Sequence, residues 1–403
     1  MVSSKELIEI DSKYGAHNYH PLDVVISKAK GIWVWDVEGK KYLDCLSAYS
    51  AVNQGHLHPK IVQALKDQAD KLTLTSRAFR NDRMGPFLKH LCDVAEMEAA
   101  LPMNTGAEAV ETGLKIARRW GYEVKGIVDN QAEIIVAEEN FHGRTITIVS
   151  FSTDPDACTH FGPKTPGFKV IPYDNPKALE QTITPNTAAF LVEPIQGEAG
   201  VNIPSPGYLK KVREICTNHN ILLILDEIQT GLGRTGKMFA YQHEGIKPDM
   251  LLVGKALGGG VFPISAALSS WDIMKVITPG SHGSTFGGNP LACAVGDAAL
   301  DVLVDEKLAE RATELGAHFK DGLHNIKAKT DRIKEVRGKG LLIAVEFKSE
   351  VGGARQFTQK LKEKGILAKE THTHTIRFAP PLIITKEDID WALKIIEEVF
   401  TET

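Results

Sequence analysis

Lys255 is the residue whose type and surroundings most directly indicate chemistry. It follows an apolar segment at 251–253 and precedes small residues and the three glycines 258–260. The apolar segment is expected to form a buried strand, and burial disfavours an ammonium ion, so the lysine should lose its proton readily. A neutral lysine at the end of a strand can form a Schiff base with an aldehyde cofactor. On this stretch alone, a surface lysine after a strand is the simpler alternative.

A carboxylate and an aromatic ring follow other apolar segments. Asp226 ends the apolar run 221–225, where a negative charge is costly unless a cation lies beside it. A protonated pyridine nitrogen is one such cation, and a structural salt bridge is the alternative. Phe141 follows the apolar run 134–137 and could stack on a flat ring, although plain core packing would also explain it.

The helix expected at 104–120 offers an anion site at its beginning. Thr105 and Glu108 fit a capping box, and the small residues Gly106 and Ala107 leave the first backbone N–H groups uncrowded. Such a helix N-terminus can bind a phosphate. Considered alone, an ordinary capped helix is the better interpretation.

The elements that must position these residues alternate between strand and helix. Apolar strands are expected at 134–137, 188–192, 221–225 and 251–253, separated by segments of crossover length. This pattern predicts an α/β fold with a mostly parallel sheet covered by helices on both faces. The polar residues all follow the carboxyl ends of strands, which is where ligands bind in such sheets.

The chain as a whole is expected to divide into three parts. Residues 1–45 are expected to form an N-terminal arm and hairpin, and residues 46–290, which contain the elements above, a large cofactor-binding domain. Helices and strands of mixed order follow in 291–403, which indicates a smaller α+β domain on which the arm packs.

A glycine-rich segment at 231–236 resembles a nucleotide-binding motif but lacks its context. The segment matches GxGxxG, yet Met238 stands where a P-loop requires Ser or Thr, and residues 226–229 separate the glycines from the strand. We therefore interpret the segment as a flexible glycine loop.

Composition excludes several classes of function. The net charge of −4 gives no basic field for nucleic acid. The five cysteines are scattered and form no CxxC pair, so neither a zinc site nor structural disulfides are expected. No apolar run approaches membrane-spanning length, and the first residues do not resemble a targeting signal. A cytoplasmic enzyme is the expectation, and a processed organellar form would look the same.

Taken together, the motifs resemble the class III aminotransferases, which use pyridoxal 5′-phosphate and have the fold-type I architecture. The resemblance covers nearly the whole chain and is carried by residues 104–108, 141–144, 226–229, 254–256 and 284–290. The segments 14–21, 47–56, 193–200 and 377–381 look like the ornithine-specific branch of that family.

The resemblance implies a role for each cofactor-binding residue. Lys255 would bind the cofactor covalently and carry the proton, and Asp226 would hold the pyridine nitrogen. Phe141 would stack on the ring, and Gln229 would contact its phenolic oxygen. Gly106 and Ala107 would hold the phosphate, and the family pattern also assigns Ser284 and Thr285 to the cofactor, with Thr285 reaching the site of a partner subunit in a homodimer.

The resemblance also implies the substrates, L-ornithine and 2-oxoglutarate. Arg144 would bind the α-carboxylate of ornithine, Tyr19 would contact its α-amino end, and Tyr49 would shape the pocket. Arg377 would bind a carboxylate of 2-oxoglutarate, and Glu198 would pair with Arg377 until that acid arrives. The δ-amino group would be transferred, giving glutamate 5-semialdehyde and glutamate.

Other functions remain open from the sequence. Acetylornithine and 4-aminobutyrate aminotransferases are the nearest alternatives, and a mutase or decarboxylase using the same cofactor is more distant. A non-catalytic binding protein on this fold belongs to a different class. The combination of Lys255, Asp226 and Phe141 argues against that class, because a protein without the chemistry has no need of all three.

Overall fold

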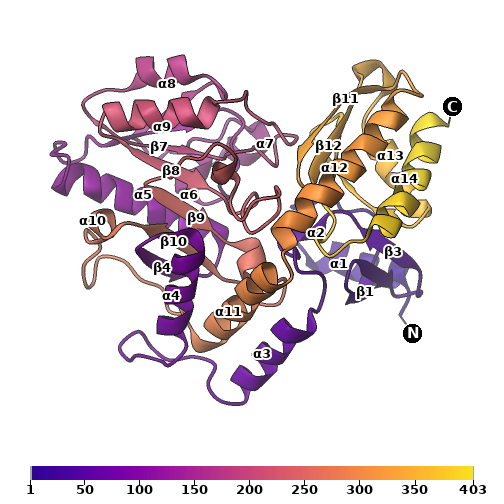
Figure 1. The fold of residues 1–403 in the computed structure, drawn as a ribbon, viewed down its shortest axis with the longest axis horizontal. Helices are drawn as coiled ribbons and strands as arrows, with labels where there is room; N and C mark the ends of the chain where they lie inside the picture. Colours follow the sequence, from indigo (N-terminus) through magenta and orange to yellow (C-terminus); the bar gives the residue numbers. More distant parts are fainter. Residues whose placement is uncertain (1, 403) are drawn as a thin grey trace.

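The computed structural model describes residues 2–402 and is built around a seven-stranded sheet (Figure 1). The strand order is β4-β10-β9-β8-β7-β5-β6. The pairs from β9 to β6 are parallel, and β10 is antiparallel to both of its neighbours. The mostly parallel sheet predicted from the sequence is therefore confirmed. The strands are β4 (Ala99–Met103), β5 (Glu133–Ala137), β6 (Phe168–Ile171), β7 (Thr187–Val192), β8 (Leu222–Asp226), β9 (Met250–Val253) and β10 (Ser265–Ser269).

Helices cover both faces of this sheet because its strands are apolar on both sides. Successive residues of one strand point to opposite faces, so Leu223 and Leu225 enter one core cluster while Leu222 and Ile224 enter the other. Helix α5 (Gly106–Glu123) lies on the second face, and α9 (Tyr208–Asn218) lies on the first. Further helices of this region are α3 (Pro59–Ala69), α4 (Met84–Ala95), α6 (Ile146–Val149), α7 (Pro155–Cys158), α8 (Pro176–Thr182) and α10 (Trp271–Met274).

Two four-stranded sheets lie beside the large one (Figure 1). The first joins the N-terminal strands β1 (Ile26–Lys30), β2 (Trp33–Asp36) and β3 (Lys41–Asp44) to β13 (Ile366–Leu367), which runs parallel to β3. The N-terminal hairpin and the C-terminal part of the chain thus share a sheet. The second contains β11 (Ile333–Lys339), β12 (Leu342–Phe347), β15 (Thr375–Phe378) and β14 (Lys369–Thr371), with helices α12 (Leu308–Lys327), α13 (Arg355–Glu363) and α14 (Lys386–Thr401) nearby. Helix α11 (Pro290–Asp305) instead packs against α3 and α4 (Figure 1).

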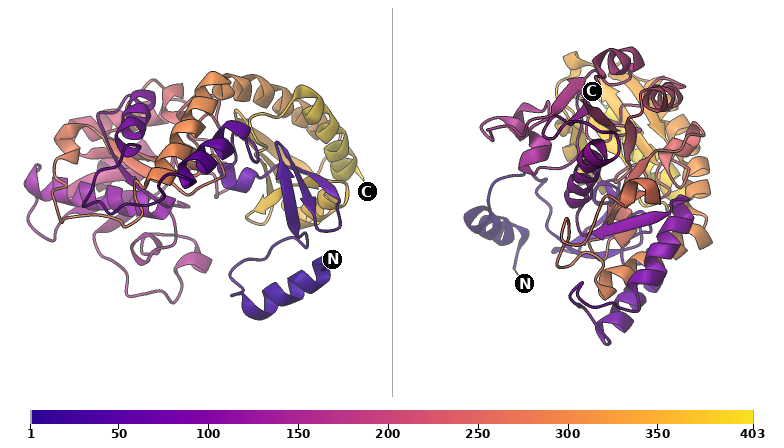
Figure 2. Two further views of the ribbon diagram at one scale, coloured as in Figure 1. Left: turned by 90° about the horizontal axis from the view of Figure 1, so that it is seen from below. Right: turned by 90° about the vertical axis from the view of Figure 1, so that its left-hand side faces the viewer.

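The N-terminal arm contains a helix that was not predicted from the sequence. Helix α1 (Ser4–Tyr14) begins with a capping box between Ser3 and Glu6. It has no buried residue, and Figure 2 shows it standing away from the body of the molecule. A helix that buries no face needs no apolar stripe, so hydrophobic periodicity could not reveal it, whereas the capping box could have. Within residues 2–402, none of the helices has the length and apolar character needed to span a membrane.

Candidate active site

An inner cavity of about 190 Å³ lies where the parallel strands end. Asp226 is the last residue of β8, Lys255 follows β9, and Phe141 follows β5. Because β5, β8 and β9 are parallel, their carboxyl ends meet at one edge and bring these residues together. The predicted residues that line the inner cavity are Gly106, Ala107, Phe141, Asp226, Gln229 and Lys255.

Lys255 is held in an unusual backbone conformation. Its φ of +47° is in the left-handed region, which is costly for a residue with a Cβ and occurs where the surroundings impose it. Gln54 helps to impose it, because its Nε2 donates to the carbonyl of Ala256 at 2.9 Å. Burial lowers the pKa of Lys255, an effect that the nearby Glu198 carboxylate opposes and the Arg377 cation reinforces. The amine is thus prepared to act as a nucleophile or base.

Asp226 is fixed by two hydrogen bonds. Its Oδ2 lies 2.7 Å from Nδ1 of His142, and its Oδ1 accepts the N–H of Ile228 at 3.0 Å. The His142 ring is buried, and its Nε2 has no hydrogen-bond partner among residues 2–402. Although burial opposes charge on this ring, the hydrogen bond and the charges of Asp226 and Glu193 raise the pKa of His142. A charged His142 would supply part of the positive charge that Asp226 needs.

Glu193 is a second buried acid that the sequence did not identify as functional. Its Oε2 accepts the backbone N–H of Phe141 at 3.0 Å, which fixes the residue expected to stack on a ring. Burial raises the pKa of Glu193 to about 8, His142 opposes this, and Asp226 adds to it. Its position directly after β7, at the same sheet edge as Asp226, was the available signal. His142, beside Phe141 after β5, has a similar position, but its pairing with Asp226 could not be predicted because the contact spans 84 residues.

The beginning of α5 opens into the inner cavity. Thr105 caps the helix by accepting the N–H of Glu108, whose side chain in turn accepts the N–H of Thr105 at 2.7 Å. The first helical residues, Gly106 and Ala107, line the cavity. This end of an 18-residue helix has the free donors and the dipole that suit an anion.

Ser284 and Thr285 do not line the inner cavity of their own chain. The Oγ of Ser284 accepts a hydrogen bond from Asn104 Nδ2 at 2.9 Å, just before the beginning of α5. Thr285 is exposed. The structure therefore brings Ser284 near the helix end and leaves Thr285 facing outward.

An outer cavity of about 640 Å³ adjoins the inner one and contains four of the five expected substrate residues, whereas Arg377 is absent from the lining of both cavities. Tyr19, Tyr49, Phe141, Arg144 and Glu198 line it. The Arg144 guanidinium lies 5.8 Å from the centre of the Phe141 ring, and across residues 2–402 it makes no ion pair with a carboxylate. A cation without a carboxylate partner in a cavity suits a carboxylate ligand.

Arg377 is a buried cation that already has a partner. Its Nη1 donates at 2.9 Å both to Oε1 of Glu198 and to Oε1 of Gln229, and at 3.0 Å to the carbonyl of Gly197. Its guanidinium lies 5.0 Å from the ring centre of Tyr49. Burial of Glu198 acts to raise the pKa of its carboxyl, but the Arg377 cation opposes burial, and the net result is a lowered pKa that keeps Glu198 charged.

Gln229 belongs to this cluster as well. Besides accepting from Arg377, it donates from Nε2 to Oε1 of Glu198 at 2.9 Å. The amide expected to contact the cofactor's phenolic oxygen is thus engaged by the two substrate residues. Gly197 makes room for it, because a Cβ at this position would collide with the Gln229 amide.

The inner cavity fits pyridoxal 5′-phosphate in the chemistry of its groups. Lys255 offers an amine with a lowered pKa for the aldehyde. Asp226 offers a buried carboxylate for the pyridine nitrogen, and the beginning of α5 offers donors for the phosphate. The three groups face one small cavity.

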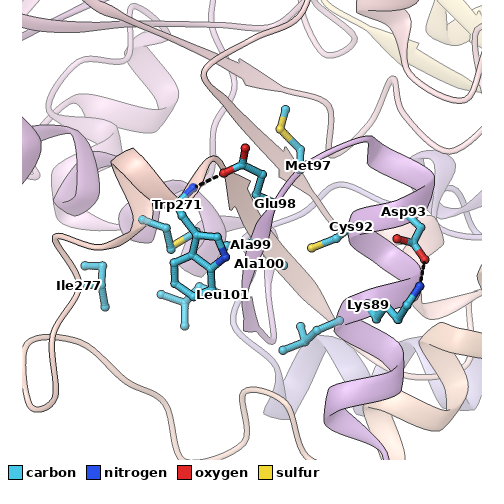
Figure 3. A pocket seen from close by; sticks show the side chains of 12 residues that line it. Lys89, Cys92, Asp93, Met97, Glu98, Ala99, Ala100, Leu101, Trp271 and Ile277 are labelled. Carbon is cyan, nitrogen blue, oxygen red and sulfur yellow. Dashed lines mark hydrogen bonds and ion pairs between the residues drawn. The ribbon is translucent and has the colours of Figure 1, made fainter.

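A separate cavity of about 510 Å³ lies between α4, β4 and α10 (Figure 3). Its polar groups are paired with one another: Lys89 contacts Asp93 at 2.5 Å, and Glu98 accepts the N–H of Trp271 at 2.7 Å. Cys92 lies in it, and burial raises the pKa of this thiol, which keeps it protonated. The cavity contains none of the residues predicted to be functional.

Comparison with known families now gives the class of protein. Residues 14–400 match the family described as Aminotransferase class-III, and the chain belongs to this family. A protein named ornithine aminotransferase from Brevibacillus brevis is 60% identical over 403 residues, covering 100% of both chains.

Solved structures agree in fold over the full length. The structure of the ornithine aminotransferase from Toxoplasma gondii ME49 has a TM-score of 0.98 and 51% identity, covering 99% of this chain and 95% of that one. An acetylornithine aminotransferase from Elizabethkingia anophelis has a TM-score of 0.91 and 52% identity, covering 100% of both chains. A second relative, named ornithine aminotransferase and from Bacillus subtilis, is 61% identical over 396 residues, so sequence similarity favours the ornithine interpretation over the acetylornithine one.

Proposed function

We propose that this chain is an ornithine aminotransferase, which transfers the δ-amino group of L-ornithine to 2-oxoglutarate. The observation that carries the proposal is the contrast between two arginines. Arg377 is paired with Glu198, whereas Arg144 in the outer cavity has no carboxylate partner among residues 2–402. A donor that reacts through its terminal amine needs one free cation to bind its α-carboxylate. A dicarboxylate acceptor needs a second cation, which a residue of the chain must neutralise while the donor is bound.

Ornithine is held by its α-end in the outer cavity. Arg144 binds the α-carboxylate as a two-pronged donor, and Tyr19 contacts the α-amino group. Tyr49 lines the outer cavity, and its ring centre lies 6.0 Å from Nζ of Lys255 and 5.0 Å from the guanidinium of Arg377. The δ-amine then points toward Lys255. Once the ammonium of Lys255 has lost a proton, its neutral amine can accept a proton from the δ-carbon of ornithine.

Pyridoxal 5′-phosphate is the cofactor that the inner cavity would hold. When bound, it supplies an electron sink that stabilises negative charge on the carbon next to the reacting amine. Asp226 would bind its ring nitrogen, Phe141 would lie on its ring, and Gly106 and Ala107 would bind its phosphate. Gln229 would contact its phenolic oxygen once released by its present partners.

The acceptor, 2-oxoglutarate, uses Arg377. Glu198 must move away from this guanidinium before a carboxylate can replace it. The charge around Arg377 is then the same with either partner, so the exchange leaves no unpaired buried cation. Glu198 thereby decides which of the two substrates the cavity accepts.

The proposed assembly is a homodimer in which Ser284 and Thr285 serve the cofactor, Thr285 that of the neighbouring subunit. The exposure of Thr285 and its absence from the lining of its own inner cavity support this proposal. Sedimentation of the wild-type protein and of Thr285→Ala, together with cofactor affinity, tests it. A monomer that binds the cofactor fully would contradict it.

The choice of amino donor is tested by steady-state kinetics with three donors and 2-oxoglutarate. Ornithine should have a kcat/KM at least about 100-fold above those of acetylornithine and 4-aminobutyrate, because a free α-amino group and α-carboxylate are both contacted. A preference for acetylornithine would support the alternative donor and remove the role given to Tyr19.

A further inference from the structure

Arg234 lies in the glycine-rich segment 231–236 and is completely buried. The interpretation of this segment as a flexible loop is wrong, because residues 231–236 are all buried and hydrogen-bonded to their surroundings. Arg234 donates from Nη1 to the carbonyls of Leu341 at 2.9 Å and Pro380 at 2.6 Å. Its Nε and Nη2 donate to Oδ1 of Asn53 at 3.2 Å and 2.6 Å.

Neutral oxygens surround this cation. Within residues 2–402 no carboxylate forms an ion pair with Arg234. Burial lowers the pKa of Arg234 to about 9, an effect that the Asp44 carboxylate opposes and the Arg377 cation reinforces. An arginine in a dry site without a carboxylate is costly, so its four directed donor contacts must be what keeps it there. They join three segments that are far apart in the sequence.

The first of these segments carries Tyr49. Four consecutive residues, Ser47 to Ser50, have φ values of 50°, 46°, 60° and 71°. This left-handed turn is unfavourable for residues other than glycine, so contacts at its ends must maintain it. Asn53 lies just beyond the turn, accepts from Arg234, and donates from Nδ2 to the carbonyl of Leu232 at 2.9 Å.

The second segment carries Arg377. This residue is on β15, and Pro380 follows shortly after the strand ends. Arg234 binds the Pro380 carbonyl directly, and the backbone oxygen of Arg234 accepts the N–H of Leu341 at 3.1 Å. One arginine therefore ties the end of β15 to the loop that follows β8, the strand that carries Asp226.

These two segments meet in the substrate site, where the guanidinium of Arg377 lies 5.0 Å from the ring centre of Tyr49. We infer that Arg234 is a positioning residue that sets the placement of Tyr49 and Arg377 relative to each other and to the inner cavity. The inference rests on the proposed function, which gives Tyr49 and Arg377 their substrate roles. Arg234 can position both groups because its guanidinium is a rigid fork that binds Asn53 and the Pro380 carbonyl at the same time.

Arg234→Lys tests the fork, because it keeps a basic side chain but cannot reach Asn53 and both carbonyls together. We expect the KM values for ornithine and 2-oxoglutarate to rise about tenfold, since both substrates depend on the displaced groups. We expect kcat to change by less than about threefold, because Lys255 and Asp226 are held by other contacts. Arg118→Lys is the matched control, since Arg118 also donates to a backbone carbonyl, that of Pro166, and lies in the later turns of α5, away from the helix end that opens into the inner cavity.

A folded Arg234→Lys protein with both KM values unchanged, or with kcat lost and KM unchanged, would overturn the inference. If this variant does not fold, Asn53→Ala removes the Asn53 contacts to Arg234 and to the Leu232 carbonyl, keeps those of Arg234 to Leu341 and Pro380, and should raise both KM values by a smaller factor. Unchanged KM values in Asn53→Ala would overturn the inference as well. The wild-type protein distinguishes a failure of the proposed function: if it does not use ornithine, that function fails. The wild-type protein and the Arg234→Lys variant are then compared by calorimetry of glutarate, a dicarboxylate that competes with Glu198 for Arg377.

Discussion

Nη1 of Arg377 and Oε1 of Glu198 are 2.9 Å apart, and the amide of Gln229 contacts both side chains. The cation is therefore neutralised inside the substrate site by a residue of the same chain. On the proposed function, a second carboxylate binds Arg377 by replacing Glu198. Substrate selection then becomes a competition between two carboxylates for one guanidinium.

Removing that competitor should favour dicarboxylic amino acids. In Glu198→Gln we expect the rate of amino transfer from glutamate, relative to that from ornithine, to rise about tenfold, because Arg377 is no longer occupied by a charge. Single-turnover kinetics with each donor would measure the ratio. Glu346→Gln, which breaks an arginine–glutamate pair outside the site, is the control. An unchanged ratio would show that Glu198 does not act as a switch.

The same substitution should change the pH dependence of Lys255. Burial lowers the pKa of this amine, and the Glu198 carboxylate partly opposes that effect. The neutral amine is the reactive form, and its population grows as pH rises through the pKa. Glu198→Gln should therefore extend the reaction of the cofactor-free protein with pyridoxal phosphate to lower pH. A rate profile that stays in place or moves to higher pH would contradict the charge coupling.

Substitution of Arg144 should weaken ornithine binding specifically. In Arg144→Gln we expect the KM for ornithine to rise about 10- to 100-fold, because a two-pronged charged contact to the α-carboxylate is lost. The KM for 2-oxoglutarate should change much less in the same steady-state assay. Arg119→Gln, on the exposed side of α5 and paired with Glu123, is the control. Equal effects on the two substrates would show that Arg144 is not selective.

Glu193 should make stability depend on pH in the cofactor-free protein. Burial raises its pKa in the folded state to about 8 from an ordinary value of 4.5. Its contribution to stability is therefore fully present below the unfolded-state pKa and is lost as pH rises through about 8. Glu193→Gln does not titrate and can still accept the N–H of Phe141.

The melting temperature of Glu193→Gln, relative to the wild-type protein, should thus rise between about pH 4.5 and pH 8. Thermal unfolding measured at several pH values in this range would show it. A constant difference across the range would mean that Glu193 is already ionised in the folded protein at low pH.

The sequence predicted those parts of the site that depend on local pattern. Lys255 and Asp226 were found because each ends or follows an apolar strand, and parallel strands bring such ends together. The capping box of Thr105 and Glu108 was found because its spacing is local. Strand β10 was not predicted, since Ser265–Ser269 is short and lacks the strongly apolar character of its neighbours.

Contacts between distant segments could not be predicted in this way. The His142–Asp226 hydrogen bond spans 84 residues, and the two-sided engagement of Gln229 depends on how β15 approaches the end of β8. No role was predicted for Arg234 in the glycine-rich segment, because its partners Asn53 and Pro380 lie more than a hundred residues away on either side. Such contacts arise from the packing of whole elements, which no local spacing encodes.

The most direct test of the account is a visible absorption spectrum of the purified protein incubated with pyridoxal phosphate, recorded before and after L-ornithine is added without an oxo acid. We predict a yellow band that bleaches with ornithine and responds far more weakly to acetylornithine and 4-aminobutyrate. Lys255→Ala should lose both the band of the lysine-bound cofactor and the activity. A wild-type protein that acquires no band would contradict the role of Lys255, and a band that ornithine leaves unchanged would contradict the assigned substrate.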